Sequence, residues 1–116
     1  MLTPYPQAIN DSEVAFFAHH DIEMLEERGL NLPREVPTNS VPPEEWRERL
    51  LAMRNARADA YFLSCTNIRA LPVIETLEAE LGAPVISSNQ AMLWRALRMA
   101  GIADAVPGYG TLLRAH

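Results

Sequence analysis

Two short apolar runs, each followed by a helical pattern, constrain the fold of this chain more than any other feature. Residues 60–64 (Ala-Tyr-Phe-Leu-Ser) and 84–87 (Pro-Val-Ile-Ser) are continuous apolar stretches. Such stretches are typical of strands that a parallel sheet buries on both faces. Helical patterns follow over residues 72–81, with Gly82 as the stop, and over residues 89–100. This alternation predicts an α/β fold: a mainly parallel sheet with helices on both faces, in three layers.

The earlier part of the chain extends the same pattern. Residues 1–3 are predicted as the end of a first strand, and a helix is expected over residues 7–18, with Ile9, Phe16 and Phe17 on one face. Asn10 and Glu13 offer a capping box, so this helix has an alternative start at Asn10. Residues 22–25 are predicted as a short strand.

A proline-rich loop and a third helix complete the predicted elements. Four prolines without periodicity predict a loop over residues 31–43. Pro43 with the following acidic residues predicts a helix that runs to about Ala58 and buries Trp46, Leu50 and Met53. The last helix is expected to turn Leu93, Leu97 and Ala100 inward, with Gly101 as its stop.

Length, charge and composition narrow the class of protein. A chain of 116 residues is enough for one domain, residues 1–116. A net charge of −5 argues against nucleic acid as a partner, since polyanions need clustered basic residues. All ten basic residues are Arg, which excludes Schiff-base chemistry on a Lys amine. No apolar run of about 18 residues exists, so no membrane span is expected. A single cysteine and no leader sequence predict a cytoplasmic protein.

Cys65 is the main candidate for chemistry. It follows the strand predicted over residues 60–64, and ligands of open α/β sheets bind outside the carboxyl ends of strands. Backbone N–H groups of the following turn would stabilise a thiolate there. The alternative is that Cys65 is a small buried hydrophobe, as lone free cysteines commonly are. The sequence predicts that the sulfur faces an open cleft.

Polar residues at two other strand ends are further candidates. The hydroxyl of Ser88 could bind a carboxylate, but Ser88 or Asn89 could equally be the N-cap of the last helix. Tyr5 follows the first strand, where its phenol could donate to a carboxylate or lie as a rim aromatic. No metal site is expected, because the adjacent His19 and His20 should point to different faces of a helix.

The ordered motifs resemble the aspartate/glutamate racemase superfamily, in its maleate cis-trans isomerase and arylmalonate decarboxylase branch. The resemblance spans residues 3–110, nearly the whole chain, and leaves out the loop at residues 31–40. The most specific part is the Cys65 block together with the later Ser-Ser-Asn-Gln block at this spacing. The matching stretches are Thr3-Pro4-Tyr5, residues 63–70, Ile74-Glu75, residues 81–85, residues 87–91, Trp94, Leu97-Arg98, Gly101-Ile102 and Gly108-Tyr109-Gly110.

The resemblance implies a role for each candidate residue. Cys65 would be the acid/base or nucleophilic thiol on one face of a small dicarboxylic acid, and no cofactor would be needed. The backbone N–H groups of Thr66 and Asn67 would hold a carboxylate or enediolate. Tyr5 would donate to a substrate carboxylate. Thr66 and Asn67 favour an isomerase, because decarboxylases tend to have glycines after the cysteine, while a decarboxylase, a racemase and a non-catalytic remnant stay open.

The resemblance also implies that a second lobe is missing. Members of this branch have two pseudo-symmetric lobes with the substrate between them, and this chain corresponds to the C-terminal lobe. Two explanations of the missing lobe stay open: a truncated or split gene, and a fragment of a longer chain. The chain alone is expected to be inactive, and its inter-lobe face should be apolar. We therefore expect it to pair with an N-terminal lobe or with a second copy as a homodimer.

Overall fold

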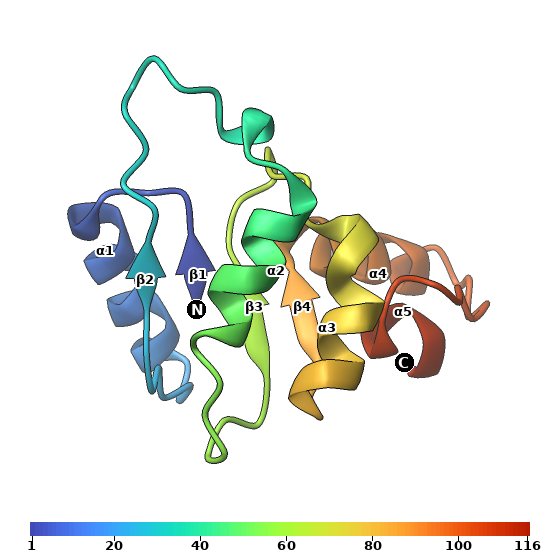
Figure 1. Cartoon of the computed structure of the whole chain (residues 1–116). Coiled ribbons are helices and arrows are strands. Elements are labelled where there is room, and N and C mark those ends of the chain that lie inside the picture. The colour runs from blue at the N-terminus through green and yellow to red at the C-terminus, as the bar shows by residue number, and fades with distance from the viewer.

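The computed structural model describes residues 1–116 and contains one four-stranded sheet (Figure 1). Its strands are β1 (Leu2–Thr3), β2 (Arg28–Gly29), β3 (Tyr61–Leu63) and β4 (Val85–Ser87), in the spatial order β2-β1-β3-β4. Every neighbouring pair is parallel. The predicted α/β class is confirmed, and β3 lies in the interior of the sheet.

Helices cover both faces of the sheet, which gives three layers. Helices α2 (Pro43–Leu51) and α3 (Ile74–Leu81) lie in front of the sheet in Figure 1. Helices α1 (Gln7–His19) and α4 (Ser88–Met99) lie behind it, and the short α5 (Thr111–Ala115) contacts α4. Two 3-10 turns, Thr38–Ser40 and Leu71–Val73, precede α2 and α3. None of these helices is long and apolar enough to span a membrane.

The core lies mainly between the sheet and the front helices. Trp46 and Leu50 of α2, as predicted, are fully buried, and Met53 is buried just after the helix. They pack with buried residues of the strands and of α3: Leu2, Leu63, Ile74, Leu77 and Val85. Gly82 ends α3 with a left-handed backbone (φ 72°), which a residue without Cβ adopts at low cost. The helix stop predicted there is confirmed.

Two predicted elements are placed differently in the structure. Residues 22–25 form no strand; the edge strand is β2, Arg28–Gly29, which pairs with β1. Helix α2 ends at Leu51 rather than near Ala58. The Asn55 side chain accepts from the Arg57 backbone N–H at 3.0 Å, while the Asn55 N–H donates to the Tyr61 hydroxyl at 2.9 Å. These bonds stabilise a turn in place of further helix.

The start of α4 also differs from the prediction. Its N-cap is Ser87, not Ser88 or Asn89, and the Ser87 hydroxyl and Gln90 amide form a reciprocal capping box. The helix therefore turns Gln90 inward, and Leu93, predicted to be buried, is half-exposed. Ala100, also predicted inward, is exposed. The inward stripe of α4 therefore includes Gln90, and Leu97, the remaining residue of the predicted stripe, is partly buried.

The polar residues of α1 have different roles from those predicted. Asn10 lies inside the helix and is fully buried, so it is not a cap. The rings of His19 and His20 lie 5.3 Å apart rather than on different faces, because the helix ends between them.

Candidate active site

Cys65 lies two residues beyond the last residue of β3, at the carboxyl edge of the sheet. Its Sγ accepts a hydrogen bond from the backbone N–H of Asn67 at 3.3 Å. The Cys65 backbone has a φ of 154°, which a residue with a Cβ seldom adopts. The sulfur of this strained residue therefore receives a backbone donor from the turn that follows it.

Ser88 connects the next strand end to Cys65. The Cys65 N–H donates to the Ser88 Oγ at 3.2 Å, so the first residue of α4 lies directly beside the cysteine. Because this hydroxyl accepts from the backbone, its own hydrogen stays free to donate to a bound acid. The neighbouring Asn89 side chain donates to the Thr66 carbonyl at 3.0 Å and ties the two loops together.

The exposed Thr66-Asn67 turn is also held by a residue that the sequence did not reveal. Thr38 donates from Oγ1 to the Asn67 carbonyl at 3.1 Å and accepts from the Asn67 side-chain amide at 2.8 Å. Thr38 belongs to the proline-rich loop, 29 residues earlier in the chain. No local pattern connects these positions, so only the folded chain could identify Thr38 as part of the site.

Tyr5 reaches the same place from the end of β1. Burial raises the pKa of its hydroxyl above the ordinary value, and a hydrogen bond with Cys65 and the nearby Cys65 and Glu13 charges raise that pKa further. The phenol therefore stays protonated near neutral pH and can donate to a carboxylate.

A buried network fixes the turn that carries Tyr5. The Tyr5 N–H donates to Thr3 Oγ1 at 3.0 Å, and that hydroxyl donates to Asn10 at 2.6 Å. Asn10 in turn donates to Glu27 at 2.6 Å. Gly29 passes so close that a Cβ on it would lie 2.2 Å from the Tyr5 carbonyl oxygen. Thr3, Asn10 and Gly29 therefore position Tyr5, and sequence reasoning had assigned none of them that role.

Glu13 is a further residue whose place at the site sequence reasoning missed. Its Oε1 accepts a hydrogen bond at 2.7 Å from the hydroxyl of Ser64, the residue that precedes Cys65. Its Oε2 is buried without a hydrogen-bond partner. Glu13 therefore places a carboxylate close to the thiol and to Tyr5.

The sequence pattern of the arylmalonate decarboxylase family matches residues 1–113. The chain belongs to this family. Its curated relatives include the maleate isomerase of Nocardia farcinica, which is 30% identical over 115 residues, covering 98% of this chain and 46% of the relative. The arylmalonate decarboxylase of Bordetella bronchiseptica is 46% identical over 56 residues, covering 47% of this chain and 23% of the relative.

One solved structure has nearly the same fold as this chain. It is a Cys-to-Ser mutant of the Nocardia farcinica maleate cis-trans isomerase with a covalently bound succinylcysteine intermediate. The TM-score is 0.92 at 28% identity, over 99% of this chain and 47% of the other. The chain therefore spans about half the length of the relatives it matches.

The thiol is more enclosed than predicted. Cys65 is only 7% exposed and packs against the hydrophobic core, and it lines none of the three main cavities. The prediction of a sulfur facing an open cleft is therefore not met in this chain. The Thr66-Asn67 turn, tied down by Thr38 and Asn89, contacts the sulfur through the Asn67 N–H. The nearest of these cavities, about 340 Å³, reaches Ser64 and runs along α1.

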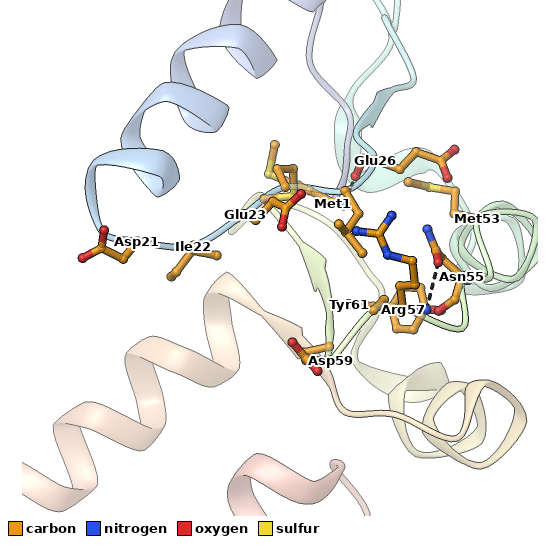
Figure 2. Close-up of a pocket in the computed structure, with 14 residues that line it drawn as sticks. Met1, Asp21, Ile22, Glu23, Glu26, Met53, Asn55, Arg57, Asp59 and Tyr61 are labelled. Carbon is orange, nitrogen blue, oxygen red and sulfur yellow. Dashed lines mark hydrogen bonds between the residues drawn. The ribbon is translucent and has the colours of Figure 1, made fainter.

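The largest of the three cavities, about 460 Å³, lies at the opposite end of the strands. Figure 2 shows its lining residues, among them Met1, Tyr61 and Asp59, which precede or begin strands. Four carboxylates and one guanidinium line it: Asp21, Glu23, Glu26, Asp59 and Arg57. This excess of negative charge opposes the binding of a small dicarboxylate, so volume alone does not identify the site.

Proposed function

We propose that this chain is the cysteine-bearing lobe of a cofactor-independent isomerase that acts on a small dicarboxylate, as maleate isomerases do. The observation that carries the proposal is Cys65 at the carboxyl end of β3, with the Asn67 N–H on its sulfur. The succinylcysteine found in a relative of the same fold supports covalent chemistry at a cysteine.

In the proposed reaction the thiolate adds to one carbon of the double bond. A C–S bond forms, and the π electron pair moves to the neighbouring carbon, where the adjacent carboxylate delocalises it as an enediolate. The central bond is then single and rotates. The electron pair re-forms the double bond and expels the thiolate, so no proton or electron is gained or lost overall. Covalent catalysis of this kind divides one high barrier into two lower ones.

The surrounding residues would hold the charged intermediate. The backbone N–H groups of the Thr66-Asn67 turn would bind one carboxylate, as an oxyanion hole does. The Tyr5 phenol, protonated near neutral pH, and the Ser88 hydroxyl would donate to the same acid. In this reaction Cys65 is the nucleophile, and a group of the partner lobe would face it across the substrate.

A decarboxylase is the second candidate function. It is favoured by the 46% identity with the Bordetella bronchiseptica arylmalonate decarboxylase over 56 residues. Thr66 and Asn67 after the cysteine, where decarboxylases tend to have glycines, favour the isomerase. An amino-acid racemase would use the same thiol as an acid/base, and a non-catalytic acid-binding remnant would use only the donors.

Catalysis by this lobe requires a partner lobe. Chemistry on a planar intermediate needs groups on both faces, and correct placement of two reacting groups contributes on the order of 7–11 kcal/mol. The relatives are about twice as long as this chain, so an N-terminal lobe or a second copy would supply the other face. We place the protein in the cytoplasm, where a lone free thiol stays reduced.

Turnover needs both lobes, but the first step, addition of the thiolate, involves only Cys65 and the donors of this lobe. The test is therefore the mass of the intact chain after incubation with maleate. The single cysteine makes any adduct assignable. When the enediolate is trapped by a proton from water, the proposal predicts one added succinyl group on Cys65, and none on a Cys65→Ala variant with the same thermal midpoint. Urea-unfolded chain is the control for nonspecific thiol addition. An adduct that forms no faster on the folded chain than on the unfolded chain would contradict the proposal.

A further inference from the structure

Glu13 is a charged residue beside the thiol to which the proposed reaction gives no role. Its Oε1 accepts from the hydroxyl of Ser64, which is buried directly before Cys65. Its Oε2 is buried without a hydrogen-bond partner. None of the five ion pairs of the chain involves Glu13. A partly buried carboxylate that no cation neutralises exerts its negative charge on the groups around it.

The groups around Cys65 fall on two sides. Cys65 follows β3, which has β4 on one flank and β1 on the other. On the β4 side, the Ser88 hydroxyl and the turn N–H that binds the sulfur are hydrogen-bond donors. On the β1 side, the Tyr5 phenol lies with the Glu13 carboxylate of α1. The Glu13 charge acts on that phenol: burial and Cys65 raise the pKa of the Tyr5 hydroxyl most, and Glu13 raises it further.

The two sides would treat a bound acid differently. A carboxylate on the β4 side would receive two donors, the turn N–H and the Ser88 hydroxyl. A carboxylate on the β1 side would gain a donor from Tyr5 but would also face the charge of Glu13. Like charges repel more strongly in a partly buried site than in water, because less solvent screens them.

From this contrast we propose that Glu13 is a specificity-determining residue, which keeps negative charge off the β1 side of Cys65 and so fixes how a dicarboxylate lies. One carboxylate would stay bound on the β4 side while the other half of the molecule rotates about the central bond. The proposal rests on the proposed function for the class of substrate, and it adds the orientation in which that substrate binds.

Two alkylating reagents of nearly equal size test the charge. Iodoacetate is an anion and iodoacetamide is neutral, and both react with the single free thiol of the chain. The ratio of their rate constants at one pH cancels both the thiolate fraction of Cys65 and the frequency with which the turn opens. Glu13→Gln removes the charge but keeps an acceptor for the Ser64 hydroxyl. The ratio of iodoacetate to iodoacetamide rates should therefore rise at least about threefold.

Matched variants separate the charge from the hydrogen bond. Asp11→Asn removes a carboxylate of the same helix that bonds to the Gln7 side chain, and it should leave the ratio within about 1.5-fold of the unaltered value. Ser64→Ala removes the hydrogen bond to Glu13 but keeps the charge, so the ratio should not rise. Thermal midpoints verify the fold of each variant. If Glu13→Gln does not fold, Glu13→Asp and Glu13→Asn repeat the comparison of charge at equal length.

An unchanged ratio in Glu13→Gln overturns the proposal, and so does an equal rise in Asp11→Asn or Ser64→Ala. The result is distinct from the test of the proposed function, because both reagents alkylate a thiol whether or not maleate adds to it. A chain that forms the maleate adduct but shows no change in the ratio keeps its proposed function and loses the orienting role of Glu13.

Discussion

The two edges of the sheet differ in what they contain. The amino edge has the largest of the three cavities, about 460 Å³, lined mainly by carboxylates and apolar side chains. At the carboxyl edge none of the three cavities reaches the thiol, but hydrogen-bond donors from three strand ends converge there: the Asn67 N–H, the Ser88 hydroxyl and the Tyr5 phenol. A site for a small anion is determined by converging donors, and cavity volume is a poor guide where part of the binding wall comes from another lobe.

The difference has a simple structural origin. Turns that follow parallel strands at the carboxyl edge present free backbone N–H groups, and a helix that begins there adds its positive end. The amino edge receives the carboxyl ends of helices and the acidic connection after α1. Substitutions at the two edges should therefore have very different effects on Cys65.

The largest effect is expected for Gly29→Ala at the carboxyl edge. The new Cβ would lie 2.2 Å from the Tyr5 carbonyl oxygen and 2.8 Å from the Asn10 amide, so β2 must move away from the turn that holds Tyr5. We expect a loss of about 3 kcal/mol in the free energy of unfolding, measured by urea titration. Gly101→Ala is the control, since its Cβ meets nothing within 4 Å, and its positive φ should cost only about 1 kcal/mol. Equal losses at the two positions would contradict this account.

A smaller effect is expected when the turn over Cys65 is released. Thr38→Val removes both hydrogen bonds to Asn67, which are worth on the order of 1 kcal/mol. Opening of the turn should become more frequent, and the rate of Cys65 alkylation by iodoacetamide should rise about fivefold. Ser40→Ala is a control in the same loop, because the Ser40 hydroxyl bonds only to the Pro37 carbonyl. A similar acceleration in both variants would show that the Thr38 contact does not control access.

Because the pKa of the Tyr5 hydroxyl is raised, we expect alkaline pH to have a modest effect on stability. Because burial raises its pKa in the folded chain, the stability that the protonated phenol contributes is complete below about pH 10, the ordinary tyrosine value, and is lost as the pH rises beyond it. Tyr5→Phe should therefore lose less stability than the unaltered chain between about pH 9 and pH 11. Thermal midpoints across this range measure the difference, with Tyr109→Phe as the exposed control. Parallel curves for Tyr5→Phe and the unaltered chain would refute the role of Tyr5.

The smallest effect is expected at the amino edge. Asp59→Asn changes the charge of the 460 Å³ cavity without touching the groups around Cys65. Solvent and salt screen a charge beyond about 8 Å, so the alkylation rate of Cys65 should stay within about 1.5-fold of the unaltered value. A change as large as that of Thr38→Val would mean that the two edges are coupled.

Local sequence patterns predicted the parts of the fold that local physics determines. The apolar runs gave β3 and β4, the helical stripe gave Trp46 and Leu50 of α2, and Gly82 marked the end of α3. The same logic put Cys65 and Ser88 at neighbouring strand ends, where the structure joins them by a hydrogen bond. The two-residue strand β2 was misplaced, because so short an edge strand has no periodicity to read.

The sequence by itself therefore determined the alternation of strands and helices and the position of the thiol, because each depends on residues a few places apart. Only the tertiary structure decided what surrounds the thiol. Thr38 meets Asn67 across 29 residues, and Glu13 meets Ser64 across 51. Contacts at such separations arise from the packing of whole elements, and no local preference encodes them. For the same reason the helical stripes of α1 and α4 could not show which of their apolar side chains stay exposed. A helical stripe shows which side chains share a face, and the fold decides whether that face is covered.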